Sequence, residues 1–314
     1  MRITRLAPSP TGALHLGNAR TFLVNWLLAR QNGWRIILRI EDLDGPRIKR
    51  GADQQAIEDL RWLGIDWDEG PIYQSAHKEA YDAAERLLDE GGHTFICVCS
   101  RKDVASAASA PHASDGAAVY PGTCRNLVFD LVAGTPFVVR FRVPDEVVTF
   151  DDAFAGRQSF DVARQLGDFV ISKSDDTPAY QLAVVVDDAA AGVTDVVRGD
   201  DLLDSTPRQM LVYRALGIAD RIPTYYHLPL VVGTDGRRLA KRHGDTRLSA
   251  YRDAGRSPAD ILAVLAKWCG MDQAIGAASA SELLPHFDLA RLPRSPMVVD
   301  PSSHPALRLE SRRP

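Results

Sequence analysis

The sequence lacks the features that mark membrane, secreted and nucleic-acid-coating proteins. No apolar run approaches the length that spans a bilayer, and the start Met1-Arg2-Ile3 lacks the apolar region of a secretory signal. Only four cysteines occur in 314 residues, so a disulfide scaffold is not expected. Lysine and arginine (37) nearly balance aspartate and glutamate (41), which argues against indiscriminate nucleic-acid binding but not against a local RNA-binding face. We therefore expect a cytoplasmic protein.

What is present is the composition of an ordinary globular protein, with 45% hydrophobic and 25% charged residues. The length suits one large domain or two modest ones. Basic residues cluster at 47–50 and again at 237–242. Each cluster alone fits a solvated surface as well as a phosphate site.

The stretch from Ile3 to Asn18 predicts a strand, a tight loop and the start of a helix. Ile3–Leu6 is a short apolar run, and the loop that follows is rich in proline and glycine. From Asn18 onward, apolar residues fall on one helical face, and Gly33 is a suitable end. The inward-facing residues are Ala19, Phe22, Leu23, Trp26 and Leu27. His15 and Asn18 thus lie where a helix begins, where polyphosphates bind well, although an ordinary loop with an exposed histidine fits the same pattern.

A second strand is predicted at Arg35–Ile40, which completes a βαβ unit and implies a parallel sheet. Ligands of such sheets bind beyond the carboxyl ends of the strands. Residues 8–18 and 41–44 both lie there. Glu41 could hold a ligand ammonium at this edge, or it could belong to a solvated acidic turn.

Three cysteines form a spaced pattern, Cys97-Val98-Cys99 and then Cys124, with Tyr120 four residues before the last. Thiolates are the preferred ligands of structural zinc, and a tyrosine phenolate is an unusual fourth donor. The residues alone also allow free cysteines. Cys269 lies among apolar positions of a late helix, so we expect it in the core.

The second half of the chain contains a candidate site for binding a carboxylate and a basic loop. Leu182–Val186 is rich in β-branched residues and predicts a buried strand, preceded by Tyr180. Arg198 ends another short apolar run, where its guanidinium could grip a carboxylate or pair with a neighbouring aspartate. A further strand is predicted at residues 227–232, before the basic loop.

Helix starts in this half are marked by capping residues. Ser205 or Thr206 with Pro207 predicts one start, and Ser257 with Pro258 predicts another.

The motifs together resemble class I aminoacyl-tRNA synthetases of the glutamyl branch. The run RLAPSPTGALHLGN at residues 5–18 resembles their "HIGH" signature, and residues 238–242 stand for "KMSKS", with Ala240 in place of the serine. The resemblance covers about residues 3–270 and includes Tyr73-Gln74-Ser75. It implies an α/β, Rossmann-like doubly wound parallel sheet.

The resemblance also implies a domain order. Residues 1–92 and 166–246 would form the two halves of the catalytic domain, 93–165 an inserted zinc-knuckle or acceptor-binding-like subdomain, and 247–314 a helical C-terminal region.

Site residues are implied by the same match. Catalytic roles would fall to His15, Asn18 and Lys241, and ATP would be bound by His15, Gly17, Asn18 and Lys241. The glutamate ligands would be Arg5, Leu6, Ala7, Pro8, Ser9, Glu41, Tyr180 and Arg198. One structural Zn²⁺ would be held by Cys97, Cys99, Tyr120 and Cys124, and Mg²⁺ would accompany ATP.

The cysteine–tyrosine pattern matches the glutamyl-queuosine branch of the family. Its shortened members lack the helical anticodon-binding domain, and no such domain follows in this sequence. We therefore expect a monomeric enzyme that activates glutamate with ATP and transfers it to queuosine in the anticodon of tRNA(Asp), with no membrane partner. The alternatives are a truncated synthetase that charges tRNA(Glu), an adenylating enzyme with a small-molecule acceptor, and a non-catalytic RNA-binding relative.

Overall fold

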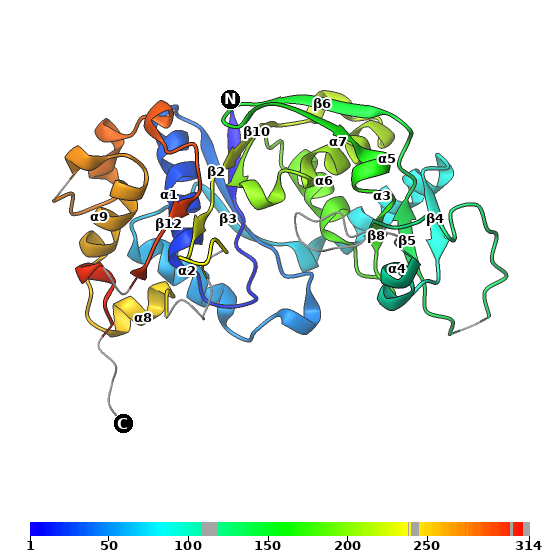
Figure 1. Ribbon diagram of the computed structural model, residues 1–314, viewed down its shortest axis with the longest axis horizontal. Helices are drawn as coiled ribbons and strands as arrows, with labels where there is room; N and C mark the ends of the chain where they lie inside the picture. Colours follow the sequence, from blue (N-terminus) through cyan, green and yellow to red (C-terminus); the bar gives the residue numbers. More distant parts are fainter. Residues whose placement is uncertain are drawn as a thin grey trace. The chain divides into compact units, whose positions relative to one another are not determined.

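The computed structural model describes residues 1–107, 119–132, 134–237, 239, 245–274, 276–301 and 304–309. Two compact units make up the chain (Figure 1). The first comprises Met1–Tyr73, Asp195–Asp201 and Tyr225–Pro314, and the second comprises Gln74–Thr194 and Leu202–Thr224. The chain thus leaves the first unit twice and returns to it twice.

Strands and α-helices alternate over the first 73 residues and follow no regular alternation afterwards. The elements of the first unit are β1 (Ile3–Leu6), α1 (Leu16–Gln31), β2 (Arg35–Ile40), α2 (Ala52–Trp62), β3 (Glu69–Tyr73), β9 (Asp195–Gly199), β10 (Thr224–Leu228), β11 (Val231–Val232), α8 (Leu248–Asp253), α9 (Pro258–Trp268) and β12 (Met297–Val298). Those of the second unit are α3 (Lys78–Glu90), β4 (Thr94–Cys97), α4 (Arg101–Ala107), β5 (Val138–Phe141), β6 (Val147–Asp152), β7 (Gly156–Asp161), α5 (Val162–Gln165), β8 (Phe169–Ser172), α6 (Tyr180–Ala190) and α7 (Ser205–Ala215).

The first unit is built on a five-stranded sheet in the order β10-β9-β1-β2-β3. β1 pairs in parallel with β2 on one side and with β9 on the other. The chain winds outward from β1 through β2 and β3, then resumes on the opposite side with β9 and β10. This order confirms the doubly wound, Rossmann-like sheet, and its switch point lies between β1 and β9, where ligands of such sheets bind.

Helix α1 is fixed to β1 by a buried polar side chain. Asn25 accepts a hydrogen bond from the Thr4 hydroxyl and donates one to the carbonyl of Arg5, both at 2.9 Å. The predicted apolar face of α1 is buried, with only Phe22 half-exposed. The helix begins at Leu16, two residues before the predicted start, and Gly33 follows its end at φ 64°, a conformation that glycine adopts without strain.

The second unit combines small antiparallel sheets with helices. β4, β5 and β8 form one sheet, and β6 pairs with β7. A buried network joins α3 to α6, because Asp187 accepts hydrogen bonds from Gln74 Nε2 at 2.6 Å and from the Tyr81 hydroxyl at 2.9 Å. Gln74, part of the Tyr73-Gln74-Ser75 motif, therefore has a structural partner in α6.

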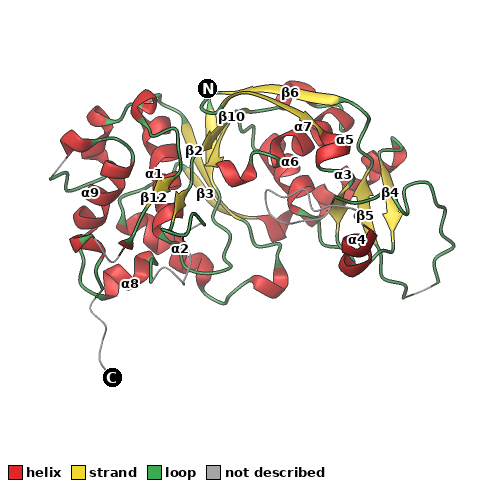
Figure 2. Cartoon of the chain, viewed as in Figure 1, coloured by secondary structure: helices red, strands yellow, loops and turns green. Residues whose placement is uncertain are grey.

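The predicted strand at Leu182–Val186 is wrong, because these residues lie inside helix α6 (Figure 2). Nearly every side of the helix is buried, so a continuous apolar run does not separate a buried strand from a buried helix. The helical penalty of valine is only a few tenths of a kcal/mol per residue, about 0.7 at most, which burial outweighs. The helix also brings Asp187 to the α3 network.

Two further boundaries differ from the prediction. Helix α7 begins at Ser205 with Asp204 as N-cap, so Pro207 occupies the first turn rather than the first position. Proline is tolerated there because the first-turn N–H groups have no partner within the helix. The strand predicted at residues 227–232 is divided into β10 and β11, since Pro229 lies between them and has no N–H for a ladder. Ser257 caps α9 and Pro258 opens it, as predicted.

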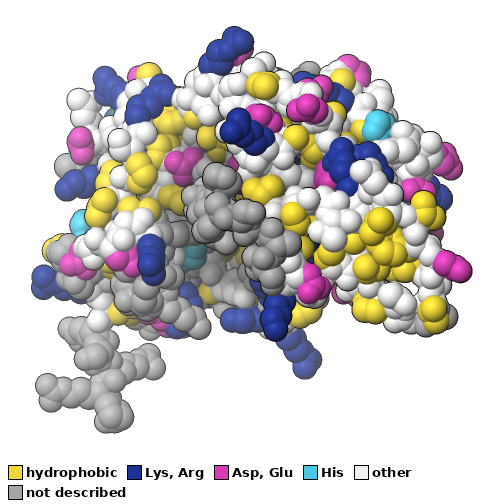
Figure 3. Space-filling model, turned by 45° about the vertical axis from the view of Figure 1, so that its right-hand side comes forward, with side chains coloured by type: hydrophobic (Ala, Val, Ile, Leu, Met, Phe, Trp, Pro, Cys, Tyr) yellow, Lys and Arg dark blue, Asp and Glu magenta, His cyan; other side chains and the backbone are white. Residues whose placement is uncertain are grey.

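The surface carries charges of both signs. On the face shown in Figure 3, lysine and arginine side chains are scattered among aspartate and glutamate side chains. Within the described residues, no helix combines the length and the apolar character that crossing a bilayer requires.

Candidate functional site

The loop between β1 and α1 ends on His15, which caps the helix. Its Nδ1 accepts a hydrogen bond from the backbone N–H of Asn18, at 3.4 Å. In a neutral imidazole the proton then lies on Nε2, so the outer ring nitrogen is a donor. Gly17 leaves room beside it, because a Cβ there would lie 3.3 Å from the His15 ring and the ring would have to shift by a few tenths of an ångström. His15 and Asn18 thus lie at the start of the helix, as the sequence predicts.

Neighbouring segments hold this loop on both sides. The backbone N–H of Glu41 donates to the carbonyl of Pro8 at 3.1 Å, and that of Lys49 donates to Pro10 at 3.0 Å. On the other side, His15 and Arg247 form an isolated antiparallel bridge. Arg247 follows closely on the second signature, residues 238–242. The bridge therefore joins the first signature loop to a residue that follows the second signature in the chain.

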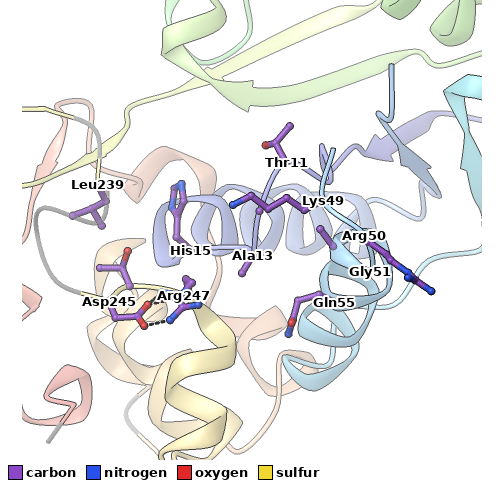
Figure 4. A pocket seen from close by; sticks show the side chains of 13 residues that line it. Thr11, Ala13, His15, Lys49, Arg50, Gly51, Gln55, Leu239, Asp245 and Arg247 are labelled. Atoms are coloured by element: carbon purple, nitrogen blue, oxygen red, sulfur yellow. Dashed lines mark hydrogen bonds and ion pairs between the residues drawn. The ribbon is translucent and has the colours of Figure 1, made fainter. Parts of the chain in front are cut away.

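A cleft of about 590 Å³ opens between these segments (Figure 4). Its lining residues are Thr11, Gly12, Ala13, His15, Lys49, Arg50, Gly51, Ala52, Gln55, Leu239, Asp245, Thr246 and Arg247. The acid among them, Asp245, is paired with Arg247, whose Nε lies 2.7 Å from its carboxylate. Lysine and arginine therefore outnumber acids in the lining, and the cleft suits an anionic ligand.

Lys49 is the basic residue most clearly directed into this cleft. Its side chain extends toward His15 in Figure 4, whereas that of Arg50 points away. The Lys49 ammonium lies 4.0 Å from the position that a Cβ on Gly12 would take. Sequence reasoning noted Lys49 only within a basic cluster, because its approach to the loop depends on the backbone hydrogen bond to Pro10.

The carboxyl ends of β1 and β2 carry two of the predicted glutamate ligands. Arg5 is buried on β1, with 4% of its surface exposed. Glu41 directly follows β2, and its carboxylate accepts a hydrogen bond from buried Arg39 at 3.0 Å. The pairing holds the Glu41 side chain in one orientation while leaving it acceptor capacity. Pro8 and Ser9 lie in the adjoining loop, after Leu6 and Ala7.

Arg198 lies on β9, the strand beyond the switch point. It is buried, and its Nε donates to His227 Nε2 at 3.0 Å. His227 is itself buried on neighbouring strand β10, and the Arg198 guanidinium lies 5.2 Å from the ring centre of Tyr225. His227 and Tyr225 orient the guanidinium. Sequence reasoning missed both, because the partnership depends on strand order.

The roles of the predicted site residues stay predictions, those of Tyr180 and Lys241 included. Tyr180 is the first residue of α6 and belongs to the second unit, so its place in a pocket with Arg198 stays a prediction. Lys241 lies outside the described residues. Of the five "KMSKS"-like positions, only Leu239 is described, and it is buried.

The cysteine pattern of the second unit becomes a compact cluster. The sulfurs of Cys97, Cys99 and Cys124 all lie within 4.8 Å of one another, so they could hold a metal ion. Tyr120 joins them, because its hydroxyl oxygen lies 3.5 Å from the Cys97 sulfur and accepts the backbone N–H of Cys124 at 2.7 Å. Cys269 is fully buried in the other unit, as predicted for a core residue.

Burial and neighbouring groups perturb the cluster. Burial and the adjacent Cys124 and Cys97 raise the pKa of Cys99 to about 11. At Cys97 burial acts in the same direction, but hydrogen bonds from Tyr120 and the Arg140 guanidinium outweigh it and lower the pKa. Three thiols packed this closely are typical of a metal site, since a bound metal deprotonates its thiols outright.

Comparison with known proteins identifies the family. Residues 2–300 match the family described as tRNA synthetases class I (E and Q), catalytic domain. The chain belongs to this family. The match spans both signature regions, the sheet and the cysteine cluster, so the class I synthetase fold predicted from the two motifs is confirmed.

Relatives of two kinds resemble this class I synthetase. The protein of Symbiobacterium thermophilum named glutamyl-Q tRNA(Asp) synthetase is 49% identical, over 96% of this chain and 97% of its own length. The glutamate–tRNA ligase of Geobacter sulfurreducens is 44% identical, over 95% of this chain but 63% of its own length.

A solved structure supports the same assignment. A glutamate tRNA ligase from Elizabethkingia meningosepticum, in complex with its amino acid, superposes with a TM-score of 0.79 at 28% identity. The alignment covers 95% of this chain and 66% of that ligase. The chain thus spans about two thirds of the glutamate–tRNA ligases and nearly all of the Symbiobacterium relative.

Proposed function

We propose that this synthetase activates glutamate with ATP and transfers it to queuosine in the anticodon of tRNA(Asp). The observation that supports the proposal is one basic cleft, lined both by His15 of the first signature and by Leu239 of the second. The acceptor is inferred from the names of relatives such as that of Symbiobacterium thermophilum. The cysteine–tyrosine cluster agrees with this branch.

In the first step, a carboxylate oxygen of glutamate attacks the α-phosphorus of ATP. A new P–O bond forms, the bond to the β-phosphate bridge breaks, and pyrophosphate leaves. No covalent enzyme intermediate is needed, so the protein acts by positioning and by stabilising charge. The Nε2–H of His15, the side chain of Asn18 and the backbone N–H of Gly17 would hold phosphate oxygens at the start of α1, since the backbone N–H of Asn18 is taken by His15 Nδ1. Lys241 would stabilise the departing pyrophosphate, and Mg²⁺ would accompany ATP.

Glutamate would lie at the carboxyl ends of β1, β2 and β9. Arg5 and Ser9 would contact it from the signature loop, Glu41 would bind its ammonium, and Arg198 its side-chain carboxylate. A guanidinium held by His227 can present two parallel donors to a carboxylate. Tyr180 would complete the pocket. In the second step, a hydroxyl of the cyclopentene ring of queuosine attacks the acyl carbon, and AMP leaves.

One assay tests the proposal against its alternatives. Purified protein receives radiolabelled glutamate, ATP and tRNAs that carry or lack queuosine. Label confined to queuosine-bearing tRNA(Asp) is the expected result. Label on tRNA(Glu) would instead identify an enzyme like the Geobacter glutamate–tRNA ligase. This is the second candidate function, and the 44% identity between that ligase and this chain supports it. Adenylate without tRNA labelling would indicate a small-molecule acceptor, and no turnover of ATP a non-catalytic relative.

We further propose that Cys97, Cys99, Tyr120 and Cys124 hold one structural Zn²⁺. A tetrahedral zinc with bonds of about 2.3 Å to sulfur and 2.0 Å to oxygen spaces its ligands about 3.8 Å (S to S) and 3.5 Å (S to O) apart. The observed 3.5 Å between Cys97 Sγ and Tyr120 Oη fits this spacing. When bound, the metal would link Cys97, the last residue of β4, to the loop that carries Tyr120 and Cys124. It would take no part in the reaction.

Cys97→Ser tests the metal site. The variant should contain almost no zinc by elemental analysis, against about one ion per chain in the parent, because structural zinc needs all four ligands. Cys269→Ala is the matched control, since that cysteine is buried in the other unit and should leave the zinc content unchanged. Full zinc content in Cys97→Ser would contradict the assignment.

Lys49→Ala tests the anionic cleft. The Michaelis constant for ATP should rise by roughly three- to tenfold at low salt, because an exposed cation near a polyphosphate loses part of its effect to screening. Pyrophosphate exchange at several ATP concentrations measures it, and the difference should shrink at high salt. Lys49→Arg retains the charge and should behave like the parent. A Michaelis constant for ATP that stays at the parental value would exclude Lys49 from the nucleotide site.

A further inference from the structure

Arg140 lies beside the cysteine cluster and is not part of any signature. It is on β5, opposite Phe95 of β4 and diagonal to Cys97 on the same sheet face, because Cys97 is opposite Val138. Only 9% of its surface is exposed. The guanidinium carbon lies 3.9 Å from the ring centre of Tyr120. A buried arginine is thus stacked on the one proposed ligand that is not a cysteine.

The hydrogen bonds of Arg140 leave part of its guanidinium unsatisfied. Nη1 donates to the carbonyl of Asp168 at 3.0 Å, which holds the group in place. The buried Nε has no hydrogen-bond partner in the described part of the chain. A buried cation with an unsatisfied donor is costly unless an anion is near. In this cluster the anion would be the ligand set itself.

The net charge of the zinc-bound site explains why a cation is needed beside it. Three thiolates outweigh the charge of Zn²⁺, and a phenolate would add to the excess, so the bound site is a buried anion. Buried charge needs compensation. Within the described residues, Arg140 is the cation that stacks on a member of the ligand set, while Arg142 lies over Phe95 instead, 5.0 Å from its ring centre.

We propose that Arg140 is the positioning residue of the metal centre: it holds the Tyr120 ring so that its oxygen faces the sulfurs, and it offsets the negative charge of the ligands. This inference rests on the proposed zinc site. Groups beyond the ligands that orient and balance a metal site are commonly worth 10- to 100-fold in metal affinity.

Zinc affinity of the full chain, measured by competition with a chromophoric chelator at fixed pH, tests the role. Arg140→Gln should bind zinc about 10- to 100-fold more weakly. Arg140→Lys keeps the charge but not the planar stack, so its loss should be smaller. Arg142→Gln is the matched control, since Arg142 also donates to backbone carbonyls but stacks on a residue outside the ligand set, and it should bind like the parent.

A double-mutant cycle shows whether Arg140 acts through Tyr120. In a Tyr120→Phe background, Arg140→Gln should cost clearly less affinity than in the parent, and cobalt-substituted protein should show the corresponding change in its visible spectrum. Additive losses would overturn the role through Tyr120. Equal zinc affinity in Arg140→Gln and the parent, or an equal loss in Arg142→Gln, would overturn the proposal while leaving the metal site intact. A parent protein that binds no zinc would overturn both.

Discussion

Lys241→Ala should lower the rate of adenylate formation by about 100-fold or more. Removing one charge contact that strengthens in the transition state has effects of this size. Lys241 keeps the second lysine of the "KMSKS" signature, and its charge would act as negative charge develops on the departing pyrophosphate. Pyrophosphate exchange, driven by glutamate and ATP, measures the step directly.

The control for this variant is another lysine in the same unit. Lys267 is exposed on α9, and Lys267→Ala should exchange pyrophosphate at the parental rate. Near-normal exchange in Lys241→Ala would remove the residue from the catalytic machinery. Because Ala240 replaces the signature serine, the hydroxyl of that serine is already absent. We therefore expect the rate of adenylate formation to depend more strongly on the lysine.

Arg198→Ala should raise the Michaelis constant for glutamate by about 10- to 100-fold, with a much smaller change for ATP. Hydrogen bonds between charged partners contribute about 1.5–3 kcal/mol, which corresponds to this range. The guanidinium is buried on β9, next to the switch point of the sheet, so water would poorly replace it. Pyrophosphate exchange with each substrate varied in turn separates the two constants.

His227→Ala provides the graded comparison for Arg198. It removes the acceptor of the 3.0 Å hydrogen bond from Arg198 Nε but keeps the guanidinium. The Michaelis constant for glutamate should therefore rise less, by about two- to tenfold. If Arg198→Ala weakened glutamate and ATP equally, Arg198 would have a structural role rather than a part in the amino-acid pocket.

Local rules predicted the first unit well. The strand–loop–helix start, the Gly33 end of α1, the strand at 35–40 and the Ser257-Pro258 start of α9 all depend on residues close in sequence. Capping, glycine and proline effects operate within one turn. They therefore need no knowledge of the tertiary structure.

Helix α6 is an element that these local rules predict wrongly. Its run of valines has the composition of a strand, and periodicity is lost when all sides are buried. Partners on other elements stabilise the helix, among them Gln74 and Tyr81, which donate hydrogen bonds to Asp187. Contacts of this kind are between residues about 110 positions apart, so no local window contains them.

In the candidate sites, too, some residues could be located from the sequence and others could not. The signature residues His15, Gly17 and Asn18 could be located from the sequence because the motif is contiguous and its chemistry requires a helix start. His227 could not, since its relation to Arg198 exists only through adjacent strands. Arg140 is a similar case: β4 and β5 pair across an intervening segment of forty residues.

For this protein, the sequence by itself determined the class I synthetase family and the parallel sheet, and it predicted ligands for nucleotide, glutamate and zinc. These are carried by residue types in short, ordered motifs. Only the tertiary structure decided that α6 is a helix, that Leu239 lines the same cleft as His15, and that Lys49, His227 and Arg140 lie beside residues of the proposed sites. The physical reason is that burial, charge compensation and strand pairing depend on residues distant in the chain, which the fold alone brings together.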